Sequence, residues 1–387
     1  MKVISDRDAL LEAINLASGV VASRTPKPQL TCVHLEASTE KGVGRLRIRA
    51  TDAEVSLTLS SERVDVESAG ACLIPADKVR AIVQAEDNEA SLSLEAGTTE
   101  CLIKGQDARF TVFGYAPNDF PDMPTFGQIA SGSVTKPKAL FTLPAGTLGG
   151  LIGRTVFAVA RETSRYAING VLIKLSGKSL EMVATDGRRL AKSEAKLSEP
   201  AEETTVCIVP TKALNLLQRL AGDPDEPLHV AVTDQQAVFA FGDADDPRAT
   251  LATSLVEGTF PPYEEVIPKN QSIKAVFDKD VLGSAVKRAA LLTNEESRGV
   301  MMAFSASSKK LRLSSRAPEM GESTIDVDLA AYTGDDVEIG FNPAFITDAL
   351  KVIADNEVAI ELAASNKPGL IRTGNEFVYV VMPVNLS

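Results

Sequence analysis

The chain has 387 residues, of which 44% are hydrophobic and 24% charged, and its formal net charge is -12. This length allows two or three domains, and the composition is ordinary for a globular protein. The negative charge argues against a tight, non-specific nucleic-acid binder, because phosphate affinity needs many lysine and arginine contacts, although such residues can still gather on one surface.

The first residues predict a cytoplasmic protein without a membrane partner. Asp6, Asp8 and Glu12 stand where a signal peptide needs an apolar core. No apolar run reaches the roughly 18 residues of a membrane span. We interpret the cysteines, which form no Cys-x-x-Cys pair, as reduced core residues rather than disulfides or metal ligands: Cys32, Cys72, Cys101 and Cys207.

Three segments, beginning at Lys2, Leu140 and Lys274, each predict a short strand, a polar cap and an amphipathic helix. In the second segment one apolar stripe predicts a continuous helix through Leu148, Leu151, Ile152, Thr155, Val156 and Val159.

Two further features recur in the same order. Thr51-Asp52 and Thr185-Asp186 each join two strands across a turn, whereas the third copy lacks the aspartate. Later in each copy, a strand ending near Pro75, Pro210 or Phe341 leads into a second helix.

The chain is therefore three copies of a unit of about 130 residues. Candidate linkers are Gly127 to Pro137 and Pro268 to Ser272. We expect an α+β protein whose domains span 1–132, 133–268 and 269–387, each with two strand-helix-strands halves and antiparallel sheets.

Five stretches, in this order, resemble the bacterial DNA polymerase III beta subunit, the DNA sliding clamp: Arg165 to Ala191, Glu257 to Asn270, Arg298 to Met302, Ile339 to Phe345 and Tyr379 to Ser387. The resemblance implies a DNA clamp fold, in which two chains close head to tail into a ring with helices inside and sheets outside. Such a ring encircles double-stranded DNA without reading its sequence, catalyses nothing and needs no cofactor. The implied partners are the DNA polymerase III alpha subunit, the clamp loader, and other polymerases and repair proteins that carry linear clamp-binding peptides.

Basic residues recur on the helix faces opposite the apolar stripes, where phosphates could be contacted without reading bases. Ordinary solvated helix faces are the alternative for each of them. A basic family position just after Pro210 is Thr211 here, so that contact is not expected. The candidate DNA-binding residues on these faces are Lys78, Arg80, Arg154, Arg161, Lys212, Arg219, Lys287, Arg288 and Lys351. The resemblance adds Arg24 and Arg165, which match family positions that touch DNA.

The apolar C-terminal residues could belong to the last strand's own core or form one wall of a groove for extended peptides. The resemblance implies a groove lined by Ile168, Thr185, Gly187, Arg188, Arg189, Leu190, Pro261, Val266, Asn342, Phe345, Val380, Met382, Pro383, Val384 and Leu386. We expect Leu190 to be a wall and Arg189 a rim residue. The chain departs from the family at Arg188, Glu265, Ser297, Asn385 and Ser387, so the charge preference for peptide flanks is expected to differ.

The resemblance also implies a dimer interface between the first unit's edge strand and the end of a helix in the third. Its candidate residues are Arg109, Phe110, Val112, Leu291, Leu292, Glu295 and Glu296. The alternative for the apolar members is an internal core position.

Two other classes of function are alternatives to a clamp. A phosphate-handling enzyme at Asp186 and Arg189 is disfavoured, because no common catalytic motif is present and both histidines, His34 and His229, lie in apolar strand contexts. No metal site is expected either, since Arg188 and Arg189 oppose a cation. A structural scaffold ring that never meets DNA is the other alternative, and retention on circular DNA would distinguish it from a clamp.

Overall fold

The computed structural model describes residues 1–22, 24–162, 166–293, 299–374 and 376–386. It divides into two compact units. Unit 1 comprises Met1–Gly149, Ala201–Thr205 and Lys212–Leu255, and unit 2 comprises Gly150–Pro200, Val206–Thr211 and Val256–Ser387. Within the described ranges, no helix is both long and apolar enough to cross a membrane.

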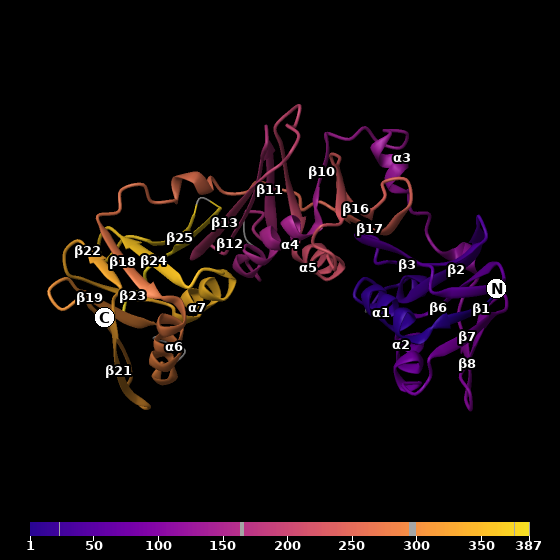
Figure 1. The fold of residues 1–387 in the computed structure, drawn as a ribbon, viewed down its shortest axis with the longest axis horizontal. Coiled ribbons are helices and arrows are strands. Elements are labelled where there is room, and N and C mark those ends of the chain that lie inside the picture. Colours follow the sequence, from indigo (N-terminus) through magenta and orange to yellow (C-terminus); the bar gives the residue numbers. More distant parts are fainter. Residues whose placement is uncertain (23, 163–165, 294–298, 375, 387) are drawn as a thin grey trace. The chain divides into compact units, whose positions relative to one another are not determined.

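Unit 1 contains a five-stranded and an eight-stranded antiparallel sheet (Figure 1). The first has the order β5 (Val64–Ser68), β1 (Lys2–Asp6), β7 (Ser91–Ala96), β8 (Glu100–Lys104), β9 (Arg109–Phe113). The second has the order β10 (Ala139–Pro144), β15 (Pro227–Val232), β16 (Gln236–Gly242), β17 (Pro247–Ser254), β4 (Val55–Ser61), β3 (Val43–Thr51), β2 (Cys32–Glu40), β6 (Gly70–Pro75).

Unit 2 contains a nine-stranded and a four-stranded sheet. The first has the order β14 (Thr205–Pro210), β11 (Gly170–Ser176), β12 (Ser179–Thr185), β13 (Arg189–Lys196), β26 (Phe377–Val381), β25 (Gly369–Thr373), β24 (Glu357–Leu362), β18 (Ile273–Asp278), β22 (Ala331–Thr333). The second has the order β21 (Gly321–Asp328), β20 (Lys310–Ala317), β19 (Val300–Ser305), β23 (Val337–Phe341).

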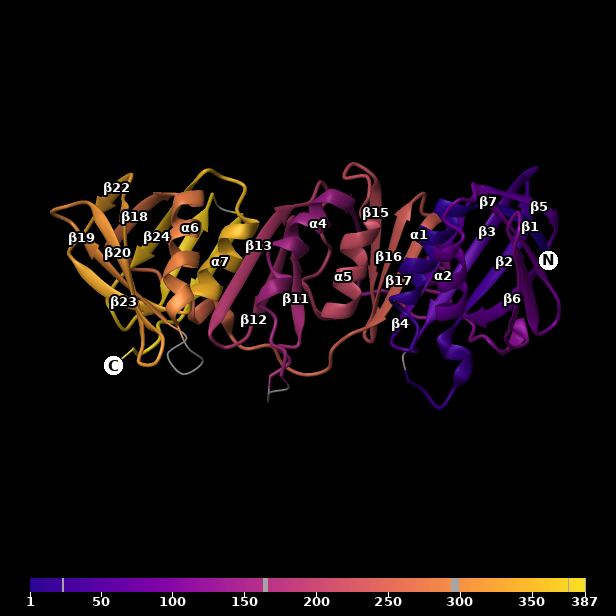
Figure 2. The same cartoon turned by 90° about the horizontal axis from the view of Figure 1, so that it is seen from below.

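The expected helices form in pairs. In unit 1, α1 (Arg7–Ser18) packs beside α2 (Ala76–Ala85), and in unit 2, α6 (Lys279–Ala289) packs beside α7 (Pro343–Val352), as Figure 2 shows. The predicted polar caps are confirmed at two of them. The Asp6 carboxylate accepts the Ala9 N–H at the start of α1, and Asp278 accepts the Asp280 and Val281 N–H groups at the start of α6.

The helix predicted through Val159 is shorter than its apolar stripe. α4 (Ala145–Gly153) ends at a glycine, and a separate 3-10 turn covers Val156–Ala158. Three glycines in the sequence GGLIG weaken the helix, because glycine loses more backbone entropy than other residues on becoming helical. The buried Thr155 hydroxyl donates to the Leu151 carbonyl at 2.8 Å, which satisfies a group freed at the helix end. The other second-unit helix, α5 (Thr211–Leu220), forms as expected.

The predicted linker from Gly127 is wrong in its first part. A short helix, α3 (Phe126–Ala130), forms there and buries Phe126 and Ile129 against β15 and β16. Its Thr125–Gln128 capping box supplies partners for backbone groups at its start. This segment therefore covers part of a sheet face rather than only joining two domains.

Both larger sheets run across the boundaries of the predicted repeats. Strand β4 of the first repeat pairs with β17 of the second, and β13 of the second pairs with β26 of the third. In each case the strand after the Thr-Asp turn meets the last strand of the next repeat.

Candidate functional site

The turn from Thr185 to Arg189 is held by a local set of hydrogen bonds. The Thr185 hydroxyl donates to the Arg189 carbonyl at 2.7 Å and accepts the Gly187 N–H at 3.1 Å. One Asp186 carboxylate oxygen accepts the N–H groups of Arg188 and Arg189, each at 3.0 Å. Gly187 has a φ of 83°, a conformation that favours glycine. The predicted Asp-Gly turn is confirmed.

The first repeat builds the same turn with the same Thr-Asp pair. The Thr51 hydroxyl donates to the Val55 carbonyl at 3.0 Å, and one Asp52 oxygen accepts the Val55 N–H at 2.7 Å. Ala53 takes the place of glycine at a φ of 80°. The other Asp52 oxygen pairs with Lys212 Nζ at 2.5 Å. Burial would raise the pKa of Asp52, but its bonds to Lys212 and to backbone N–H groups outweigh burial and lower the pKa.

Arg189 is a largely buried residue that links neighbouring segments, not the rim residue that we expected, since its side chain is only 10% exposed. Its Nε lies 3.0 Å from Asp186, its Nη1 lies 2.9 Å from Asp348 on α7, and its Nη2 donates to the Phe157 carbonyl at 2.7 Å. The guanidinium also lies 4.5 Å from the centre of the Phe345 ring. With these contacts, Arg189 fixes the turn to α7 and is not available as a free cation.

The C-terminal segment is held along this turn and along β23. The Met382 N–H donates to the Arg188 carbonyl at 2.8 Å, and the Val384 N–H donates to the Gly340 carbonyl at 2.9 Å. A Cβ atom on Gly340 would lie 2.6 Å from the Val384 carbonyl oxygen and 2.9 Å from Leu386. Gly340 therefore permits the close approach of the tail, which we define as residues 382–386, to the strand.

A cavity of about 590 Å³ lies beside the tail and has this lining: Met301, Glu338, Ile339, Gly340, Ser365, Asn366, Pro383, Val384, Asn385 and Leu386. We call it the tail cavity. Three of the predicted groove residues, Pro383, Val384 and Leu386, belong to it. Met301, Glu338, Ser365 and Asn366 were not among the predicted lining residues. The period-two alternation of β23 is a signal that could have placed Glu338 on its outer face.

The other predicted groove residues differ in how far their side chains are exposed to solvent. Four are buried: Ile168, Thr185, Leu190 and Val380. Leu190 and Val380 pack under Tyr263 and Phe260, which makes Leu190 part of a core rather than an open wall. Val266 and Met382 are large apolar side chains left exposed. Asn342 uses its side chain to cap α7, accepting the Ala344 N–H.

The candidate DNA-binding residues fall into two groups. Four are in ion pairs: Lys78 with Asp77, Arg154 with Glu376, Lys212 with Asp52, and Lys351 with Asp348. Among the residues that the structure describes, no ion pair involves Arg24, Arg80, Arg161, Arg219, Lys287 or Arg288. Arg165 lies outside the described residues.

The paired helices of unit 2 enclose a basic hollow of about 440 Å³. Four of its lining residues are cationic, namely Lys279, Lys287, Arg288 and Lys351, whereas Asp280 is the only acidic one. Lys279 Nζ donates to the Ile353 carbonyl, whereas Lys287, Arg288 and Lys351 are exposed. Lys351 pairs with Asp348, which leaves Lys287 and Arg288 as the exposed cations without an ion pair among the described residues. The hollow can accept an anionic group such as a phosphate.

The candidate interface residues lie on or beside edge strands of two sheets: Arg109, Phe110 and Val112 lie on β9, and Leu291 and Leu292 lie in a 3-10 turn next to β21. β9 is the last strand of the five-stranded sheet, and β21 is the last strand of the four-stranded one. Val112 is buried within its own unit, whereas Phe113 and Leu291 are 74% and 72% exposed. Phe113 was not among the predicted interface residues. Glu295, Glu296 and Ser297 lie outside the described residues.

Both histidines are engaged within strands. His34 Nδ1 lies 3.3 Å from Arg49 Nη2, and burial together with the Arg49 charge lowers the pKa of His34 to about 4. His229 contacts the Thr142 hydroxyl at 2.9 Å and the Gly242 carbonyl at 3.1 Å. All four cysteines are buried and free, as predicted.

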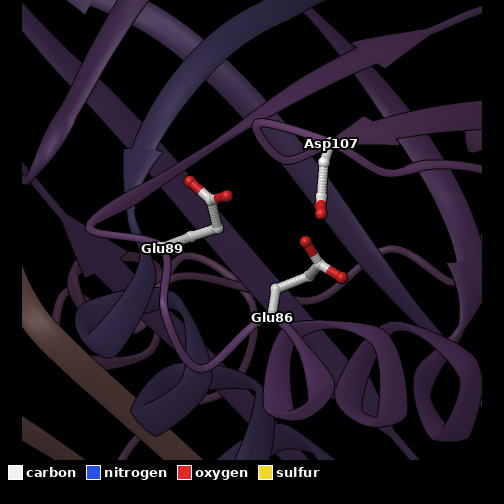
Figure 3. Close-up of side chains that lie close together, drawn as sticks. All are labelled: Glu86, Glu89 and Asp107. Carbon is white, nitrogen blue, oxygen red and sulfur yellow. The ribbon is translucent and has the colours of Figure 1, made fainter.

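One acidic cluster was not predicted. Figure 3 shows the carboxylates of Glu86, Glu89 and Asp107 pointing toward one another, with oxygens within 4.8 Å. The Gln106 N–H donates to Glu89 at 2.8 Å. No further feature of the described residues points to a ligand there, so we assign no metal site to it.

Comparisons with known proteins place this repeated α+β chain in the class with a three-domain clamp fold. Families described as the N-terminal, central and C-terminal domains of the DNA polymerase III beta subunit match residues 1–124, 142–262 and 264–385. The chain therefore belongs to the DNA polymerase III beta subunit family.

Individual relatives agree over the full length. The beta sliding clamp of Pseudomonas putida is 32% identical over 382 residues, which cover 98% of each chain, and that of Escherichia coli is 30% identical over all of both chains. A crystal structure of the Pseudomonas aeruginosa sliding clamp bound to griselimycin matches with a TM-score of 0.88 and 31% identity, covering all of both chains. The Bacillus subtilis sliding clamp matches with a TM-score of 0.86 and 26% identity, covering 100% of this chain and 99% of that one.

Proposed function

We propose that this chain is a DNA sliding clamp that encircles duplex DNA as a homodimeric ring and holds DNA polymerase III on its template. The observation that carries the proposal is the succession of three family matches along a threefold-repeated chain. We place the domain boundaries at 132/133 and 268/269 and the protein in the cytoplasm, with the nucleoid. It acts as a non-catalytic subunit.

The DNA contact in this proposal is weak and independent of sequence. Exposed cations such as Lys287 and Arg288 meet phosphates, while the net charge of -12 keeps DNA from binding elsewhere on the surface. Contacts of this kind weaken with salt and allow sliding. Lys212 and Arg154 also stabilise the fold, because their ion pairs with Asp52 and Glu376 connect segments that are distant in sequence.

The partner contact in this proposal uses the apolar surface beside the tail. Exposed Met382 and Val266, with the tail cavity next to Pro383 and Val384, suit an extended peptide from the polymerase alpha subunit, the clamp loader or a repair protein. Glu265 is exposed beside Val266 and has no ion pair among the described residues, consistent with altered flank preference.

Retention on DNA tests the proposal. After loading by its clamp loader, the protein should stay on a closed circular duplex and leave once the circle is cut into a linear form, because only a topological link is lost on cutting. Gel filtration of labelled protein with DNA measures this. Equal retention on both forms would contradict encirclement, and a scaffold without DNA affinity would be retained on neither. Griselimycin titration by calorimetry tests the groove separately.

A further inference from the structure

Among the residues that the structure describes, Glu338 is the one charged residue in the lining of the tail cavity. The rest of the lining is apolar side chains together with Ser365, Asn366 and Asn385. We propose that the tail cavity binds a lysine or arginine side chain of the partner peptide, with Glu338 as its counter-ion. This inference rests on the proposed peptide-binding function and names the peptide chemistry that the site selects.

Glu338 is not neutralised by its own sheet. Across the four strands, Glu338 is the register partner of Ala303, Ala303 is the partner of Arg312, and Arg312 is the partner of Asp326. Arg312 and Glu338 line one hollow together with Lys310, but the Arg312 Nε lies 2.9 Å from Asp326 and the Lys310 Nζ lies 3.6 Å from Asp328. The small Ala303 side chain therefore lies between Glu338 and Arg312, whose guanidinium is already paired with Asp326.

No other cation takes the place of Arg312. Glu338 is exposed and has no ion pair among the residues that the structure describes. Lys367 follows the cavity residue Asn366 along the chain, but it is not part of the lining. A carboxylate that is solvated at the edge of an apolar cavity can gain from a cationic ligand without first breaking a pair.

The remaining lining suits the stem of a long cation. Met301, Pro383 and Leu386 offer apolar surface against which the methylene groups of lysine or arginine can pack, while the charged end meets Glu338. The volume of about 590 Å³ leaves room for such a side chain and part of the peptide backbone.

The two ends of the tail also differ in charge. At Met382 the tail is bonded to Arg188, whose side chain is exposed, whereas the tail cavity presents Glu338. A peptide lying along the tail therefore meets a cation first and a carboxylate later. This fixes the preferred position of its basic residue at the tail-cavity end.

Peptide titration tests the inference. The probes are fluorescein-labelled ten-residue peptides that share one Leu-Leu-Phe anchor and carry lysine, glutamine or glutamate at each flanking position in turn. By fluorescence anisotropy at low salt, lysine at one position should tighten Kd about threefold to fivefold over glutamine, as expected for a partly exposed ion pair. Glu338→Gln should abolish this preference, whereas Asp335→Asn, the same charge change three residues away, should retain it.

Two results would overturn the inference. If Glu338→Gln keeps the lysine preference, or if wild type binds the peptides without any charge preference, Glu338 is not the counter-ion and the peptide groove itself still stands. If neither the peptides nor griselimycin bind wild type, the groove fails and the inference fails with it.

Discussion

Single basic residues in this chain act through the partners that the fold gives them. Arg189 bridges Asp186 and Asp348, and Lys212 bridges Asp52 and the Val20 carbonyl. Removing either cation would leave a partly buried carboxylate without its main partner, and an unpaired buried polar group costs more than the bond itself contributes. These residues therefore stabilise the fold whether or not they also meet a ligand.

His34 should make stability depend on pH. Burial and the Arg49 charge lower its pKa from 6.5 to about 4, so the native state stays neutral where the unfolded state takes up a proton. The unfolded state therefore binds more protons, and stability falls as pH drops from about 6.5 to about 4, by about 3 kcal/mol in total.

The measurement is urea unfolding followed at several pH values in this range. His34→Gln cannot take up the proton, so its free energy of unfolding should fall less between pH 7 and pH 5 than that of wild type. His229→Gln is the matched control and should follow wild type. Parallel pH dependence for wild type and His34→Gln would exclude His34 as the source.

At the scale of elements, periodicity and repeats predicted the six helices that recur in pairs, the capped helix starts and the Thr-Asp turns. These predictions were wrong where the helix glycines or tertiary contacts determine the limits of an element. The apolar stripe continues to Val159, beyond the end of α4, because the spacing of apolar residues does not reflect the glycines that weaken the helix. The helix α3 forms because Phe126 and Ile129 pack against a sheet face.

The candidate site divides in the same way. The turn residues Thr185 to Arg189 were predicted together and do lie together, because they are adjacent in sequence. Pro383, Val384 and Leu386 were predicted, but the rest of the tail-cavity lining was not, since β19, β23 and the segment near Ser365 meet only in three dimensions. The glycine inside β23 was the one local signal of a close backbone approach.

Gly340→Ala should weaken partner binding without unfolding the protein. The added Cβ would lie 2.6 Å from the Val384 carbonyl oxygen, so the tail must move away from β23. Overpacking of this kind costs about 1–3 kcal/mol, and we expect the affinity for the labelled peptides to fall on the order of tenfold.

Calorimetric titration gives the affinity, and a thermal melt checks the fold. Because residues 382–386 are exposed or half-buried, the melting temperature should change little. Gly150→Ala serves as the control, since an added Cβ there meets nothing within 4 Å. Unchanged affinity in Gly340→Ala would mean that the tail position does not shape the groove.

At the scale of the whole molecule, neighbouring repeats are joined by the same strand pairing, which leaves one strand of the first repeat and one of the third unpaired on one side. The strand after each turn pairs with the last strand of the next repeat, as β4 does with β17 and β13 with β26. In the third repeat the equivalent strand, β21, ends its sheet, and so does β9, the last strand of the first repeat. A second copy of the chain could supply the missing partner for both of these edge strands.

Leu291→Asp should therefore convert the proposed dimer to monomers. Leu291 is 72% exposed beside β21, so the substitution should spare the fold and act only when the partner copy buries this surface. A charge buried without a counter-ion costs several kcal/mol, enough to dissociate a dimer at micromolar concentration. Val281→Asp is the control: Val281 is also an exposed apolar residue, but it lies at the start of α6, so this variant should remain dimeric. Sedimentation velocity reads out both variants, and an intact Leu291→Asp dimer would mean that these edges do not meet.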